Sequence, residues 1–377
     1  MMKDLGTAAV LACSITNVVA FYPDGAWWTP CIMEHNARLL EVADSLGVPE
    51  SFCPVRAMLG AFVTRDRFPI PDLLVCGVGA TCDDFSAIAQ RLSGMGHPIV
   101  WWEMPHRRPP EPGEPAVGLP GGGVAPTEQV AIVEAELRRI GQAIAAAAGQ
   151  RFDENLIAAG IRRGNAIRAM LDELRTMVFT ADPCPMPALE MLIAEMLAIH
   201  YCSDRNETDQ VLLELRGEVE RRVRSGMGVL PPDAVRVFWV NPVADLRVMN
   251  LVEDVGGRIC GTDYMFTHAL DAIPEDCPPM EALARTALAD SMAGPVSQRA
   301  DRICRDAARF GSQAVLVSRI PGASHCATEG AIIAEIVRSR LDLPVIEIEV
   351  PSNTDAIEPG LCTRLQALVE TARGRHA

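Results

Sequence analysis

Strand-like apolar runs alternate with helical patterns near both ends of this 377-residue chain, and this alternation constrains its fold more than any other feature. The apolar, partly β-branched run at 10–21 is expected to form the first strand. Further along, a strand-like run at 72–77 precedes a helical pattern over 83–92 and a second run at 98–102. This rhythm is typical of βαβ units, whose strands pair in parallel. We therefore expect an α/β fold built on parallel sheets.

A loop and a helical stretch divide the chain into three segments. Residues 1–126 are expected to form an N-terminal α/β domain that ends in a Pro/Gly-rich surface loop over 107–126. Residues 127–230 form a helical segment, because apolar residues recur there at helical spacing. Residues 231–377 form a C-terminal α/β domain. Its expected strands are 235–240, 315–317 and 345–350.

Composition excludes several classes of protein. The formal net charge of −15 argues against nucleic acid as the partner, because phosphate binding needs clustered Lys and Arg. No uninterrupted apolar run reaches the ~20 residues of a membrane helix. The Val10–Cys13 segment resembles a lipoprotein cleavage box, but the residues before it carry no net positive charge. We expect a cytoplasmic protein whose cysteines are reduced or bound to metal.

Three cysteines lie at the mouth of a helix or just past a strand, far apart in the sequence. Cys53 opens a short helical pattern, Cys82 follows the run at 72–77, and Cys326 follows the run at 313–317. Ligands bind at the carboxyl ends of the strands in α/β sheets. Three thiolates gathered there would hold an iron–sulfur cluster by three irons and leave the fourth open. The pattern therefore predicts a [4Fe-4S] site.

The order and spacing of these segments resemble the large-subunit family of 2-hydroxyacyl-CoA dehydratases and ATP-dependent benzoyl-CoA reductases. The segments 53–60 and 81–83, together with Cys326, stand where this family has its cluster cysteines. The closing segment 363–368 is also similar to the family. The segment 27–35, with its paired tryptophans and a Glu-His pair, resembles the reductase subunits more than the dehydratases.

The resemblance implies two flavodoxin-like parallel-sheet domains with a helical segment between them. It also implies a [4Fe-4S] cluster on Cys53, Cys82 and Cys326, a homologous second subunit, and an ATP-hydrolysing iron–sulfur activator protein. The activator's electron would turn an acyl-CoA thioester into a ketyl radical. Some relatives hold a double-cubane [8Fe-9S] cluster. Cys260 is the best further ligand for one, but no second cysteine stands close to it, so a single cluster is favoured.

Other residues are candidates for chemistry beside the cluster. His325 neighbours a proposed ligand and could protonate a radical anion or donate to a cluster sulfur. His35 could donate a proton near the substrate or be an ordinary surface histidine. Glu103 follows a strand-like run and could face the same cleft or cap the loop. Cys31 could line the site, add a ligand or simply pack, whereas Cys76 lies inside a strand and is predicted only to pack.

Three functions remain open from the sequence. The favoured one is the iron–sulfur subunit of an ATP-activated radical enzyme, with benzoyl-CoA reduction favoured over dehydration of a 2-hydroxyacyl-CoA. The alternatives are a non-catalytic electron-transfer or scaffold subunit and a flavodoxin-like binding protein whose cysteines only pack. The run Gly121–Gly123 is expected to be a flexible loop and no phosphate cradle, because no strand precedes it and no Lys-Ser/Thr follows. With no P-loop in the chain, ATP is expected on a partner.

Overall fold

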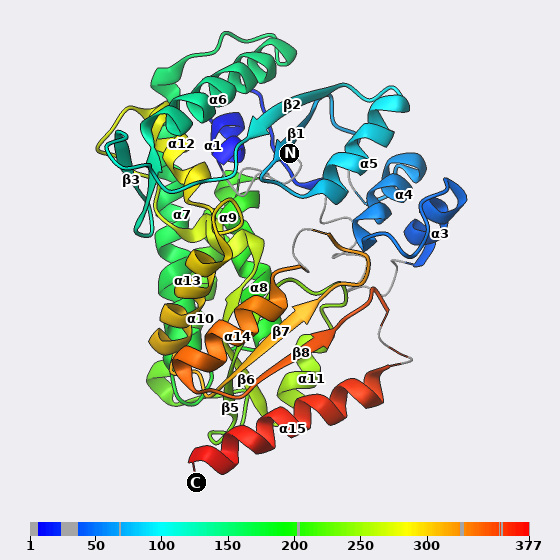
Figure 1. Ribbon diagram of the computed structural model, residues 1–377, viewed down its shortest axis with the longest axis vertical. Coiled ribbons are helices and arrows are strands. Elements are labelled where there is room, and N and C mark those ends of the chain that lie inside the picture. The colour runs from blue at the N-terminus through cyan, green and yellow to red at the C-terminus, as the bar shows by residue number, and fades with distance from the viewer. Residues whose placement is uncertain are drawn as a thin grey trace.

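The computed structural model describes residues 7–23, 37–67, 69–201, 204–324, 328–353, 355 and 357–376. Helices surround two parallel sheets and a small antiparallel hairpin (Figure 1). The predicted α/β class is therefore confirmed, while the flavodoxin-like topology of both halves stays a prediction. Over the described ranges, no helix combines the length and the apolar character that crossing a membrane requires.

The strands are β1 (Leu74–Gly79), β2 (Ile99–Met104), β3 (Ala116–Leu119), β4 (Gly123–Pro126), β5 (Val235–Val240), β6 (Gly257–Asp263), β7 (Ala314–Arg319) and β8 (Val345–Glu349). The α-helices are α1 (Thr7–Cys13), α3 (Ala37–Ser45), α4 (Ala57–Thr64), α5 (Asp83–Gly94), α6 (Thr127–Ala147), α7 (Glu154–Thr180), α8 (Ala188–Glu195), α9 (Leu197–His200), α10 (Arg205–Ser225), α11 (Val248–Asp254), α12 (Pro279–Ala289), α13 (Val296–Arg309), α14 (Gly330–Leu341) and α15 (Glu358–His376). Two 3-10 helices are η2 (Pro54–Arg56) and η3 (Met265–Leu270).

The C-terminal sheet has four parallel strands in the order β6-β5-β7-β8. Helix α15 packs against β5, β7 and β8, and α14 packs against β7 and β8. The chain passes from β5 to β6 on one side and then returns to β7 on the other, so the strand order reverses beside β5. Ligand crevices in open α/β sheets form at such a reversal, outside the carboxyl ends of the strands. The carboxyl ends of β7 and β8 point toward the part of the molecule that contains α4 and α5 (Figure 1).

The N-terminal sheet consists of β1 and β2, which pair in parallel from Leu74 opposite Ile99 to Gly79 opposite Met104. Helix α5 packs against β1 and α6 packs against β2. At its carboxyl end the two strands approach closely, because a Cβ on Gly79 would lie 2.3 Å from the Met104 carbonyl oxygen. Gly79 also has a φ of +93°, which side chains rarely adopt. Glycine at this position lets the chain turn toward Cys82.

The long helix α7 connects the helical segment with both ends of the chain. Asp153 caps it by accepting a hydrogen bond from the Asn155 amide at 2.9 Å. Helix α7 packs against α1, α10, α12 and β6, and α12 packs against α6 and β3 as well. Contacts therefore cross both predicted boundaries, at 126 and at 230, and the three-segment division itself stays a prediction.

Three sequence predictions of local structure were wrong. The run at 10–21 does not form a strand: α1 occupies Thr7–Cys13, where three alanines favour a helix. The loop at 107–126 contains the antiparallel hairpin β3–β4. Strand β6 was missed because glycines and charged residues hide it, although all of its residues are buried.

Candidate functional site

Cys53 and Cys82 both stand directly before a helical segment. Cys53 precedes η2, which Pro54 opens, and Cys82 is the N-cap of α5. Both side chains are buried, with 6% and 5% of their surface exposed. Neither thiol caps its helix through a side-chain hydrogen bond. A helix N-terminus favours negative charge, so these positions suit thiolates that bind a metal.

The loop after β7 brings a third segment to the same place. Helix α5 contacts η2, so the two cysteine-bearing segments are neighbours. The Ser324 amide donates a hydrogen bond to Asp84 Oδ2 at 2.9 Å, and Asp84 lies in the first turn of α5. Gly322 packs closely on the segment that contains Cys53. A Cβ added at Gly322 would lie only 2.5 Å from the Ser51 carbonyl oxygen. The chain leading to Cys326 therefore contacts both cysteine-bearing segments.

The structure places only part of the predicted site. Cys326, His325, Cys31 and His35 lie outside the described residues. Glu103 lies within β2, one residue before its end, where its side chain is exposed and its amide donates to Glu136 Oε2 at 2.9 Å. Within the described ranges, no cluster of three or more His, Cys, Asp and Glu side chains could hold a metal ion. The three-thiol site therefore stays a prediction.

Two buried hydrogen-bond donors near Gly77, one of them on the residue that precedes Cys82, have no acceptor in the described part of the chain. They are the Thr81 hydroxyl and the Trp102 indole N–H. Both lie over Gly77, since a Cβ there would be 3.4 Å from Thr81 Oγ1 and 3.1 Å from Trp102 Nε1. Leaving a buried donor unsatisfied costs about 1–3 kcal/mol, so such atoms often mark the place of an ion or water. Two buried thiols, with an unused donor on the residue before one of them and a second unused donor near Gly77, fit an anionic cluster with acceptor sulfurs.

Other cysteines have environments that keep the thiol neutral. Burial raises the pKa of Cys76 in β1 to about 12, and its thiol donates to the Gly77 carbonyl at 3.5 Å. Burial likewise raises the pKa of Cys260 in β6 to about 11, and its sulfur lies 3.3 Å from the Ser312 hydroxyl. Both therefore resemble packing residues more than metal ligands. Cys13 corrects the expectation of cysteines that are all reduced or metal-bound, because it is disulfide-bonded.

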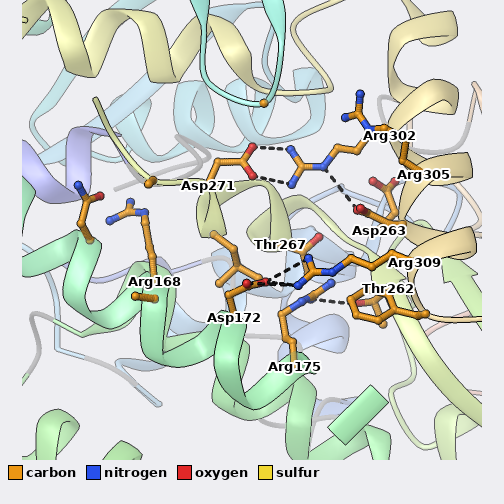
Figure 2. Close-up of a pocket in the computed structure, with 17 residues that line it drawn as sticks. Arg168, Asp172, Arg175, Thr262, Asp263, Thr267, Asp271, Arg302, Arg305 and Arg309 are labelled. Carbon is orange, nitrogen blue, oxygen red and sulfur yellow. Dashed lines mark hydrogen bonds and ion pairs between the residues drawn. The ribbon is translucent and has the colours of Figure 1, made fainter. Parts of the chain in front are cut away.

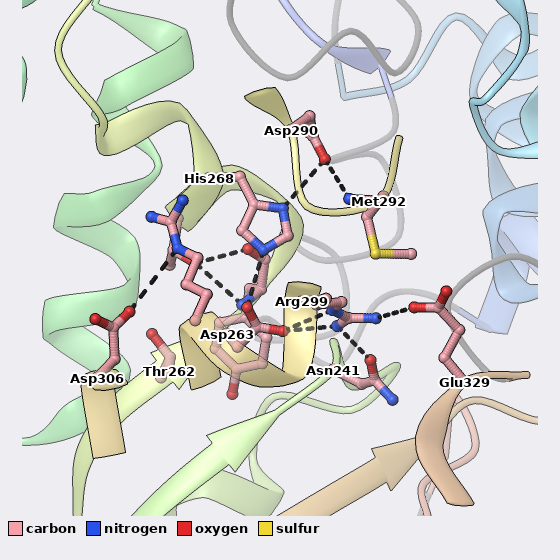
Figure 3. A network of polar contacts seen from close by, with 12 residues as sticks. Asn241, Thr262, Asp263, His268, Asp290, Met292, Arg299, Asp306 and Glu329 are labelled. Atoms are coloured by element: carbon pink, nitrogen blue, oxygen red, sulfur yellow. Dashed lines mark hydrogen bonds and ion pairs between the residues drawn. The ribbon is translucent and has the colours of Figure 1, made fainter. Parts of the chain in front are cut away.

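A buried charged network lies at the carboxyl end of β6 (Figure 3). His268 Nε2 is 2.9 Å from Asp263 Oδ1, and its Nδ1 is 3.3 Å from Asp290 Oδ1. Arg299 donates two hydrogen bonds to Asp263 Oδ2, at 2.7 and 3.0 Å. Burial opposes ionisation of Asp263, but Arg299 and His268 outweigh it and hold its pKa below the usual range. Burial also disfavours a charged His268, yet Asp263 and Asp290 raise its pKa.

The network reaches the loop that leads away from Cys326. Arg299 donates to Asn241 Oδ1 at 2.7 Å and to Glu329 Oε2 at 3.0 Å. Asn241 follows β5 directly, and Glu329 is the N-cap of α14. The sequence analysis missed these residues. Asn241 offered a signal, because it directly follows the predicted strand at 235–240, whereas Asp263 belongs to the strand that was not predicted.

An open cavity of about 800 Å³ lies beside the same loop. Residues from the carboxyl ends of β7 and β8 line it, among them Arg319 and Glu349, which form an ion pair. Ile320, Gly322 and Thr328 line it from the loop itself. This position at the carboxyl edge of a parallel sheet is where α/β proteins bind ligands.

Comparison with known proteins gives one match. A family model described as 2-hydroxyglutaryl-CoA dehydratase, D-component, matches residues 17–372. No curated protein matches the chain. The matched range contains both cysteine-bearing segments, the helical segment and the C-terminal sheet.

Proposed function

The chain belongs to the 2-hydroxyglutaryl-CoA dehydratase D-component family, and from this membership we propose that it is a subunit of an ATP-activated radical enzyme acting on an acyl-CoA thioester. The family description favours dehydration of a 2-hydroxyacyl-CoA. The expected preference for benzoyl-CoA reduction came from the segment 27–35, which lies outside the described residues, and it stays a prediction. The proposed partners are a homologous second subunit and an ATP-hydrolysing iron–sulfur activator protein.

The proposed cofactor is a [4Fe-4S] cluster held by Cys53, Cys82 and Cys326. When bound, it would accept single electrons and deliver them to the thioester. The observation that carries the proposal is the meeting of three segments: α5 contacts η2, and the loop before Cys326 contacts Asp84 and Ser51. The unused donors of Thr81 and Trp102 support it, because cluster sulfurs accept hydrogen bonds.

The chain's own residues would shield and position this site. Cys53 and Cys82 are almost completely buried, so water has little access to their sulfurs. Exclusion of water matters for strongly reducing chemistry, which side reactions with solvent would quench. The bond between Ser324 and Asp84 would hold the Cys326 loop against α5. The placement of Cys260 in a strand interior favours a single cubane over a double-cubane cluster.

The protein purified under anaerobic conditions is expected to contain about four irons and four sulfides per chain, as a single cubane requires. Iron and acid-labile sulfide analysis with a visible absorption spectrum would measure this. About eight irons would instead support a double cubane. No iron after anaerobic reconstitution would refute the cluster and leave the cysteines as packing residues.

The second candidate function is a non-catalytic electron-transfer or scaffold subunit beside a catalytic homologue. The same cluster site would serve either role. An acyl-CoA should change the EPR signal of the reduced cluster in a catalytic subunit. The signal of a relay subunit should stay the same, and this outcome would contradict the catalytic proposal.

A further inference from the structure

A second cavity, of about 370 Å³, lies between α7, α13 and η3 and is lined by five arginines and four aspartates. Figure 2 shows Arg309 of α13 pointing toward Asp172 of α7, and Arg302 of α13 pointing toward Asp271, which follows η3. Its basic lining consists of Arg168 and Arg175 from α7 and Arg302, Arg305 and Arg309 from α13. The residues of each helix recur at helical spacing and so share one face. The fold thus gathers five guanidinium groups around one space.

The arginines of α13 differ in how many hydrogen bonds and ion pairs their guanidinium groups already make. Arg302 donates to both carboxylate oxygens of Asp271, at 2.6 and 3.0 Å. Arg309 donates to the Thr176 hydroxyl at 2.9 Å and makes long bonds to Asp172, at 3.3 to 3.4 Å. Arg305 is exposed and, in the part of the chain that the structure describes, makes no hydrogen bond or ion pair. The guanidinium of Arg305 is therefore available to a ligand. Arg309 can also bind a ligand, in place of its long contact with Asp172.

The glycine turn of the β3–β4 hairpin lines another side of the cavity. Gly121 lines the cavity with a φ of +74°, and a Cβ on it would lie 3.3 Å from Asp271 Oδ2. Glycine therefore suits the backbone and keeps this side of the cavity open. The expectation that no strand precedes the glycine run was wrong, because β3 ends at Leu119. The turn is part of a hairpin that contributes to the arginine-containing cavity.

The chemistry of this lining favours an anion with several oxygens. Guanidinium groups present donors in a fork that matches phosphate, and a charge-assisted bond of this kind is worth about 1.5–3 kcal/mol. Three of the four lining aspartates are already paired with arginines: Asp263 with Arg299, Asp271 with Arg302 and Asp172 with Arg309. Burial raises the pKa of the fourth, Asp306, which favours its neutral form. We propose that this cavity binds a phosphate-bearing ligand through Arg305 and Arg309.

Coenzyme A is one source of such phosphates, and this part of the inference rests on the proposed function. Free phosphate is the other source. Isothermal titration of the full chain at low salt with coenzyme A, dephospho-coenzyme A and inorganic phosphate separates them. If the cavity binds the phosphate monoester of coenzyme A, which dephospho-coenzyme A lacks, coenzyme A will bind more tightly than dephospho-coenzyme A. If the cavity binds the diphosphate, coenzyme A and dephospho-coenzyme A will bind with equal affinity. If it reads free phosphate alone, only inorganic phosphate will bind.

Arg305→Gln is expected to weaken whichever ligand binds by about tenfold, the loss of one charge-assisted bond. Among the residues that the structure describes, this exposed side chain has no partner to lose, so the fold should stay intact. Arg151→Gln is the matched control, since Arg151 is also exposed but does not line the cavity. Equal affinity in Arg305→Gln and the unsubstituted protein, or no binding of any of the three ligands, would overturn the proposal. Iron content tests the cluster separately, because neither variant alters a cysteine.

Discussion

Replacing Cys82 with alanine is expected to abolish the iron content of the anaerobically purified protein, whereas Cys76→Ala is expected to retain it. The two cysteines are close in sequence but have different environments. Cys82 stands at the N-cap of α5, beside η2 and the unused Thr81 hydroxyl. Cys76 lies inside β1, where burial raises its pKa to about 12 and favours a neutral thiol. A thiolate is the form that binds metal, so only Cys82 is suited to ligation.

Iron and sulfide per chain, with the visible absorption spectrum, measure the outcome for both variants. Thermal unfolding is the control, because Cys76→Ala removes a fully buried sulfur and should cost about 1 kcal/mol, as is typical of a small core deletion. Cys53→Ala should behave like Cys82→Ala. Equal loss of iron from Cys76→Ala and Cys82→Ala would mean that the placement of the ligands around β1 is wrong.

Local sequence pattern predicted the elements whose character is uniform along their length. Strand β5 was expected at 235–240 and spans Val235–Val240, because its residues are nearly all apolar or β-branched. Strand β6 was missed, since Gly257, Arg258 and Asp263 interrupt the apolar pattern. Its charged residues can be buried only because distant groups satisfy them. The Val178 carbonyl accepts a hydrogen bond from Arg258, for example.

The sequence predicted only those features of the candidate site that depend on the residues next to each cysteine in the chain. The sequence shows that Cys53 and Cys82 precede helical patterns, and the structure agrees. The contact between Ser324 and Asp84 joins residues 240 positions apart and has no local signature. The network around Arg299 was hidden for the same reason, because its partners come from three separate loops and strand ends.

Asp263→Asn is expected to lower the free energy of unfolding by about 3–5 kcal/mol, the usual cost of breaking a buried ion pair. Asp263 and Arg299 are almost completely buried, with 4% and 1% of their side chains exposed. Removing the carboxylate leaves the Arg299 guanidinium and a protonated His268 without their main counter-ion. Asp342→Asn is the control, because its pair with Arg375 is exposed and should contribute little.

The pH dependence of the stability that Asp263→Asn loses identifies the cause of that loss. The depressed pKa of Asp263 contributes stability above the usual aspartate value of 3.8, and this is lost as the pH falls through the native value. The raised pKa of His268 contributes stability below 6.5, and this is lost as the pH rises through its native value. The network is therefore complete between pH 3.8 and 6.5. Urea unfolding should show the largest difference between Asp263→Asn and the unsubstituted protein near pH 6 and a smaller one near pH 9. A difference that is the same at both pH values would mean that the charge of His268 is not coupled to Asp263 and that the substitution acts through packing alone.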